Sequence, residues 1–148
     1  MILDFKGNVE KETRTAGGTF AAMDLVKQDA NDGKYTIVAP DGVKVAGLAL
    51  TDGVDGSEFQ LLPLIPGITK IMIGIETQAN VDTAEKRLIL CGKFVALVGA
   101  TGAQEINEDK FDADLLKVED VVWHAGLGEY VAWVTAAYTS AERFVEPS

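Results

Sequence analysis

Short apolar runs separated by turn-forming residues cover most of the chain from Thr19 onward. These runs predict strands in the segments "TFAAMDLV", "YTIV", "VKVAGLAL", "TKIMIGIE", "KRLILCGKFVALVG" and "EYVAWVTAAY". Alternation is clearest in "TKIMIGIE", which places Ile71, Ile73 and Ile75 on one face. Strands separated by turns every ~8–12 residues are typical of all-β proteins. The pattern therefore predicts a mainly β fold, a small domain of the barrel or sandwich type.

Glycines mark several of the predicted turns. Gly33 in "NDGK" and Gly42 in "APDGV" follow residues that favour tight turns, so both are expected to have a left-handed φ. Gly47 lies inside a predicted strand, where glycine often indicates a bulge or a close approach of another backbone. All three glycines are therefore predicted to have structural roles.

Two segments do not follow the strand pattern. Pro63 and Pro66 in "FQLLPLIPG" argue against a regular central strand, because proline has no N–H for the ladder. In residues 108–123, "EDKFDADLLKVEDVVW", apolar side chains recur at helical spacing, and acidic residues crowd the start, where a helix dipole favours them. These apolar residues are Phe111, Leu115, Val118 and Val122. The segment predicts a helix, so we expect one or two short helices in the domain.

The first 18 residues differ in character from the rest. Residues 7–18 are polar and aperiodic, and the short apolar "MILDF" precedes them. We expect a flexible N-terminal arm over residues 1–18 and a single β-rich domain over residues 19–148. On a partner the arm would become ordered, with Ile2, Leu3 and Phe5 supplying the apolar contact. The alternative is that "MILDF" is the first strand of the domain.

Composition and charge narrow the choice of partners. The 148 residues suit one domain, and the formal net charge of −10 disfavours nucleic acid and anionic membranes as partners. No apolar run reaches the ~20 residues that span a membrane, and the first residues do not resemble a secretory signal. Cys91 is the single cysteine, and its surroundings "LILCGKF" indicate a buried small side chain that takes no part in chemistry.

The stretch "FVALVGATGAQE" resembles half of a dinucleotide-binding turn. That turn needs three glycines, and here Gly99 and Gly102 match while the third place is Glu105. A carboxylate at this place would repel a pyrophosphate, which binds at a helix N-terminus because that end attracts anions. We therefore expect no nucleotide cofactor, although an enzyme that uses this loop stays an alternative to be tested.

Other chemistry is also weakly supported. A calcium loop starting at Asp29 would need glycine where Lys34 stands and glutamate where Pro40 stands. His124 is the single histidine, so neither a histidine metal cluster nor a serine triad is indicated. The sequence predicts no catalytic residue, no metal and no cofactor, and hence a protein that is not an enzyme.

The first half of the chain carries a resemblance to a known family. The segment "AGGTFAAMDLVKQDANDGKYTIVAPDGVKVAGLALTDGVDGSEFQLLPLIPG", residues 16–67, contains "G-x-Y-x-x-A", "V-A-G-L-A-L" and a strand ending in Pro-Gly. It resembles the lambda-type head decoration, or cement, proteins of tailed phages. The resemblance implies a small β domain without catalysis that forms a homotrimer on the outside of the virion, after assembly in the host cytoplasm. The major capsid protein would be its partner, and the protein would clamp neighbouring capsid subunits.

A carbohydrate-binding β-module on a virion or cell surface is the alternative function. Trp123, Trp133 and Tyr130 would then be exposed side by side as a platform for sugar rings. Core or interface packing is the other expectation for these aromatic residues.

Overall fold

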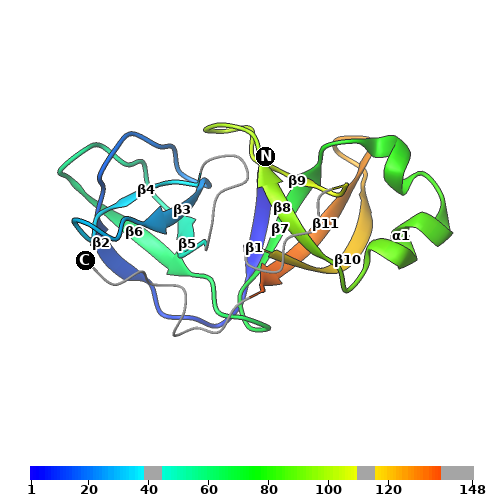
Figure 1. Cartoon of the computed structure of the whole chain (residues 1–148), viewed down its shortest axis with the longest axis horizontal. Helices are drawn as coiled ribbons and strands as arrows, with labels where there is room; N and C mark the ends of the chain where they lie inside the picture. The colour runs from blue at the N-terminus through cyan, green and yellow to red at the C-terminus, as the bar shows by residue number, and fades with distance from the viewer. Residues whose placement is uncertain (39–44, 110–115, 138–148) are drawn as a thin grey trace.

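Two β-sheets make up most of the structure (Figure 1). The computed structural model describes residues 1–38, 45–109 and 116–137. One sheet has five strands and the other has six, and two short helical segments follow one of the strands. The prediction of a mainly β fold with one or two short helices is confirmed.

The five-stranded sheet is built from the N-terminal part of the chain. Its order is β2 (Glu12–Thr15), β6 (Glu58–Pro63), β5 (Gly47–Ala49), β3 (Leu25–Gln28) and β4 (Tyr35–Ile37), all antiparallel. Leu25, Leu48 and Leu62 stand side by side in the register and face the second sheet as part of the main core. Apolar residues on the opposite face form a smaller core around Tyr35 and Phe59.

The six-stranded sheet closes on itself through a parallel pair. Its order is β1 (Ile2–Lys6), β7 (Lys70–Ile75), β11 (Glu129–Ala136), β10 (Leu116–His124), β8 (Phe94–Val98) and β9 (Glu105–Asn107). β9 also pairs with β7 in parallel, so the pairings of β7, β11, β10, β8 and β9 form a closed ring, and β1 is attached to β7 alone. Ile71, Ile73 and Ile75 of β7 are all buried in the main core, as their alternation predicts.

The helix α1 (Ala84–Leu90) overlaps a segment for which the sequence pattern predicts a strand, whereas the 3-10 helix η1 (Gln78–Val81) lies in a stretch for which no element is predicted. Both follow β7. Thr83 caps α1, because its side chain accepts a hydrogen bond from the Lys86 N–H. The helix ends before Gly92, which has a φ of +84°. The predicted strand over "KRLILCGKFVALVG" is therefore wrong in its first part and correct from Phe94 onward.

The predicted helix over residues 108–123 is wrong within the described part of the segment. Residues 116–124 form β10, which pairs with β11 along its whole length. A register shift between Val118 and Asp120 adds one residue, so Val118 and Val121 both pair on the core side. The helical pattern rests on Val118 and Val122, but Val122 pairs with Val131, and Val121 is the residue after the bulge that packs against the main core. Phe111 and Leu115 lie outside the described residues.

Pro63 does not prevent a central strand. β6 lies between β2 and β5, and Pro63 is its last residue. The missing N–H therefore falls at the end of the strand rather than within its ladder.

The structure corrects the expectation of an N-terminal arm outside the fold. β1 pairs with β7 and β2 pairs with β6, so residues 1–18 contribute one strand to each sheet. Ile2 is 7% exposed and belongs to the main core, while Phe5 is half-buried and packs against it. Leu3 is half-buried at the register shift in β1. The polar residues between the strands form only their connection, so residue 18 is not a domain boundary, and Ile2 is not available to a partner.

Two of the three predicted structural glycines lie in the described part of the chain. Gly33 has a φ of +71°, the left-handed conformation that its turn requires. Gly42 lies outside the described residues. Gly47 is buried in β5, where a Cβ would lie 2.7 Å from Leu61 Cδ1 and still closer to the Leu62 carbonyl oxygen. The close approach of β6 therefore requires glycine at position 47.

Gly47→Ala should destabilise the protein by about 2 kcal/mol or more, because the methyl group forces the β5–β6 pair apart. Gly18→Ala is the matched control, since its Cβ would meet only Thr36 Cγ2, at 3.8 Å, and its φ is not left-handed. Urea denaturation followed by circular dichroism would compare the two variants. Equal midpoints for Gly47→Ala and the wild type would contradict this packing.

Candidate functional site

The glycine-rich stretch forms a hairpin loop, not a strand-to-helix turn. β8 ends at Val98 and β9 begins at Glu105, and the two strands pair in antiparallel fashion across the loop of residues 99–104. Gly99 and Gly102 both have a positive φ, at +97° and +71°. A phosphate-binding turn requires a helix N-terminus after the glycines, and a strand follows here.

The same loop is fixed to the five-stranded sheet through buried polar side chains. Asp24 is 1% exposed and accepts hydrogen bonds from the Thr101 hydroxyl, from Gly102 N at 2.9 Å and from Ala21 N at 2.9 Å. The side chain of Gln104 binds both backbone groups of Leu25, with distances of 2.7 Å to its N and 3.1 Å to its O. We call these contacts the Asp24 latch. Their geometry gives the loop a structural role.

Thermal unfolding should not depend on NAD(P), ATP or EDTA, because the loop glycines serve the hairpin and its polar groups are engaged in the latch. Melting curves with and without each compound are expected to superimpose. A rise of several degrees with a nucleotide, or a fall with EDTA, would contradict this expectation.

The aromatic residues proposed as a sugar platform do not share one surface. Trp123 pairs with Tyr130 in the β10–β11 register, on the face that carries Ala132 and Val134 of the core. Trp133 pairs with Asp120 on the opposite face, where Lys6 Nζ lies 4.1 Å from its ring centroid. Trp123 and Tyr130 meet edge to face with centroids 5.0 Å apart, so they do not form a flat platform either.

His124 and Cys91 occupy structural positions. His124 Nδ1 accepts a hydrogen bond from Leu127 N at 3.1 Å in the β10–β11 turn. Burial raises the pKa of the Cys91 thiol, and the Asp120 carboxylate raises it further, while a hydrogen bond to the backbone of Val121 acts in the opposite direction. A raised pKa lowers the thiolate fraction and hence the reactivity of this cysteine.

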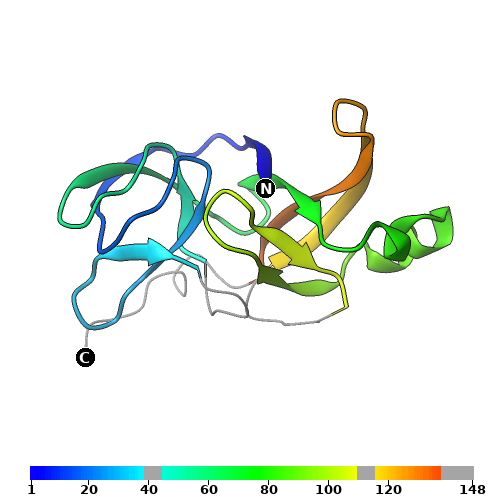
Figure 2. The same ribbon diagram turned by 90° about the horizontal axis from the view of Figure 1, so that it is seen from above.

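Exposed apolar side chains occur on α1 and on the β10–β11 hairpin, among other places. Leu88 is 74% exposed, Ile89 is 59% exposed and Trp123 is 56% exposed. Arg87 connects them, because its guanidinium lies 4.1 Å from the centroid of Tyr130, the neighbour of Trp123. We call Leu88, Ile89 and Trp123 the α1 surface. The helix α1 lies at the end of the molecule farthest from the five-stranded sheet (Figures 1 and 2).

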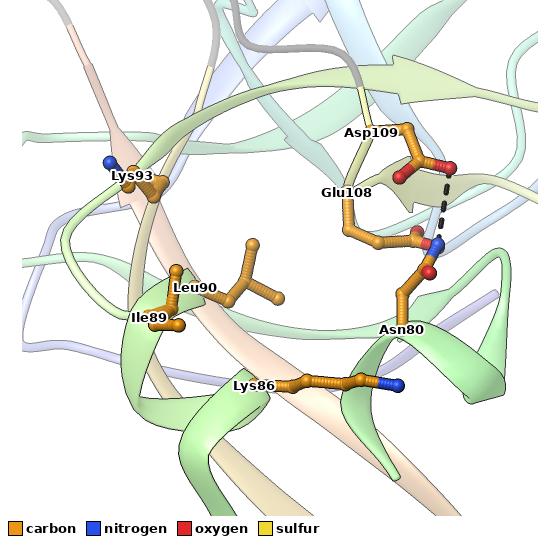
Figure 3. A pocket seen from close by; sticks show the side chains of 7 residues that line it. All are labelled: Asn80, Lys86, Ile89, Leu90, Lys93, Glu108 and Asp109. Atoms are coloured by element: carbon orange, nitrogen blue, oxygen red, sulfur yellow. Dashed lines mark hydrogen bonds between the residues drawn. The ribbon is translucent and has the colours of Figure 1, made fainter. Parts of the chain in front are cut away.

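A depression with a volume of about 220 Å³ opens beside the α1 surface (Figure 3). It is formed by α1, η1 and the residues that follow β9. Its lining residues are Asn80, Lys86, Ile89, Leu90, Lys93, Glu108 and Asp109. We call it the Glu108 pocket. The sequence pattern does not indicate this pocket, because a single glutamate next to an aspartate carries no signal of burial.

Glu108 is the most unusual group in this pocket. The residue is only 5% exposed, and its Oε1 accepts hydrogen bonds from Thr77 N at 3.1 Å and Asn80 Nδ2 at 2.8 Å. Its Oε2 is buried and has no hydrogen-bond partner among the residues that the structure describes. Leaving a buried acceptor unpaired costs about 1–3 kcal/mol, and more for a charged group. Asp109 extends the negative charge to the pocket rim, where its Oδ2 accepts from the same Asn80 amide at 3.1 Å.

The described residues offer neither a cluster of metal-ligating side chains nor a helix that could span a membrane. No group of three or more histidine, cysteine, aspartate or glutamate side chains among them is placed to hold a metal ion. No helix in the described ranges is long and apolar enough to cross a membrane.

Comparison with known proteins identifies no relative: no protein-family model matches the chain, and no curated protein matches its sequence.

Proposed function

We propose that this protein decorates the outer surface of a phage head and stabilises the shell by clamping neighbouring major capsid subunits. The proposal begins from the resemblance of residues 16–67 to phage head decoration proteins. One observation carries it: strands β3, β4, β5 and β6, which come from this segment, form one continuous sheet with β2. The resembling segment thus corresponds to one structural unit rather than to scattered motifs.

The distribution of exposed apolar groups supports a clamping role. The α1 surface lies at one end of the molecule, and the loop between β5 and β6, which carries the exposed Val54, lies toward the other (Figure 1). A protein that bridges neighbouring subunits needs contact surfaces that are well separated on a rigid body. Two sheets joined by a shared core provide such a body.

The family resemblance extends the proposal to assembly and location. The protein would associate as a homotrimer, bind the major capsid protein and reside on the virion. A net charge of −10 would repel packaged DNA and would favour binding to a less acidic protein surface. Because β1 and β2 belong to the folded sheets, we propose that exposed surfaces of the domain, and not an N-terminal arm, contact the capsid.

Co-sedimentation with purified expanded capsids tests the proposal. We expect saturable binding of the wild type, and strongly reduced binding of Leu88→Glu, which places a charge on the α1 surface. Asn8→Glu is the matched control, because this exposed residue lies in the connection between β1 and β2 and belongs to neither of the two proposed contact surfaces. Light scattering would check for a mass of three chains. Absence of wild-type binding to capsids, or specific binding to a glycan array, would contradict the proposal.

A further inference from the structure

We propose that the Glu108 pocket is a socket for a basic side chain, lysine or arginine, of the protein on which this chain docks. The identity of that protein as a capsid subunit rests on the function proposed above. The socket itself rests on three observations: a buried carboxylate oxygen without a partner, a second carboxylate at the rim, and an apolar wall beside them.

The unpartnered oxygen points to a donor that comes from outside the described chain. Thr77 and Asn80 satisfy Glu108 Oε1, and no described group reaches Oε2. A carboxylate accepts hydrogen bonds through both oxygens, and an ammonium or guanidinium group forms the strongest of these bonds. Because Oε2 is buried, an incoming cation reaches it only when the side chains that cover it move aside, and it would then supply the missing hydrogen-bond donor.

The shape of the pocket favours a cation on an aliphatic stem. Ile89 and Leu90 form one wall, and Glu108 and Asp109 stand across from them (Figure 3). Lysine and arginine side chains bury their methylene groups against apolar surface while their charged ends make polar contacts. A free inorganic cation would gain nothing from the Ile89–Leu90 wall.

A divalent metal ion fits the pocket less well. Calcium takes six to eight oxygen ligands, and magnesium requires a near-octahedral set. Here Asn80 directs its amide nitrogen, a donor, at both carboxylates. Lys86 and Lys93 also line the pocket, and their positive charges repel a divalent cation about twice as strongly as a singly charged ammonium or guanidinium group. Lys86 Nζ is engaged by the Ala79 carbonyl at 2.9 Å and by Asp82 Oδ1 at 2.9 Å, so it does not serve Glu108.

The surroundings of the pocket favour a protein as the source of the cation. Ile89 lines the pocket and is 59% exposed, and Leu88, its neighbour in α1, is 74% exposed. A buried charged contact with an apolar border is typical of the residues that dominate binding energy at protein interfaces. The net charge of −10 also attracts a basic partner surface.

The chemistry of the socket can be tested without a partner protein. We would titrate n-butylammonium into the labelled full-length protein and follow backbone amides by NMR, with n-butanol as the neutral probe and Ca²⁺ as the metal probe. The expected result is saturable shifts at Asn80, Ile89 and Glu108 with n-butylammonium only. Glu108→Gln should abolish these shifts and keep the remaining spectrum, because its carbonyl oxygen still accepts the Thr77 and Asn80 bonds. Shifts that Glu108→Gln retains, equal shifts with n-butanol, or tighter binding of Ca²⁺ would overturn the socket.

Capsid co-sedimentation then distinguishes the socket for a basic side chain from the proposed capsid-decorating function. Glu108→Gln should weaken binding by roughly tenfold or more, because it removes the charge of a desolvated pair. Glu119→Gln is the matched control, since this exposed carboxylate lies outside the pocket. If the wild type binds n-butylammonium but no capsid, the proposed function fails and the socket stands. If both Glu108→Gln and the wild type bind capsids equally, the function stands and the socket is wrong.

Discussion

A variant that lacks residues 1–15 should fail to fold. The deletion removes β1 from the edge of β7 and β2 from the edge of β6, so both sheets lose a strand. It also takes Ile2 out of the main core and exposes the apolar side chains that it covers. We expect the loss of a cooperative thermal transition, measured by circular dichroism and by the dispersion of amide signals in an NMR spectrum.

Point variants make this expectation more precise. Ile2→Asp should lower the free energy of unfolding by about 3 kcal/mol, because it buries an unpaired charge. Asn8→Asp adds the same charge to an exposed residue between the two strands and should change stability by no more than about 0.5 kcal/mol. A truncated protein that melts like the wild type would show that these strands are dispensable and would restore the arm as a docking element.

Asp24→Ala should destabilise the protein by about 3 kcal/mol or more. Asp24 accepts three hydrogen bonds, and its loss leaves the donors of Ala21, Thr101 and Gly102 without an acceptor in a partly buried site. Two of these donors belong to the β8–β9 loop, so the variant also releases the loop from the five-stranded sheet. The free energy of unfolding from urea titration would measure the effect.

The control for Asp24→Ala is a change at another aspartate, Asp52, whose side chain accepts one hydrogen bond. Asp52 is exposed, and its Oδ1 accepts only from Ala22 N, at 2.8 Å, so Asp52→Ala should cost about 1 kcal/mol or less. Gln104→Ala should resemble Asp24→Ala, because it removes both buried bonds to Leu25. If Asp24→Ala and Asp52→Ala unfold at the same urea concentration, the latch does not hold the two sheets together.

The alternation of apolar residues with turn signals was sufficient to predict the β class. The strand from Lys70 to Ile75 and the strand from Glu129 to Ala136 follow directly from their patterns. The left-handed Gly33 is predicted by the turn residues next to it. These features depend on neighbours in the sequence, because side-chain alternation and turn conformation are set within a few residues.

Where the local pattern is weaker, the secondary structure of a segment is decided by the distant strands with which it packs or pairs. "AEKRLIL" forms α1 and residues 116–124 form β10, the reverse of what their spacing suggests. β10 finds a strand partner along its entire length in β11, and its bulge hides the alternation. The first strand likewise becomes part of the fold only because the edge of β7 is open to it.

The sequence by itself determined the β class, the position of several turns and the absence of a complete nucleotide-binding motif. Only the tertiary structure decided that residues 2–6 form a strand of the second sheet with Ile2 in the core, that Asp24 holds a loop 77 residues away, and that Glu108 is buried with one oxygen unpartnered among the described residues. The physical reason is that burial and hydrogen-bond pairing are properties of contacts between distant segments. An exposed acidic residue and a buried one have the same neighbours in the chain, and they differ only in what packs around them.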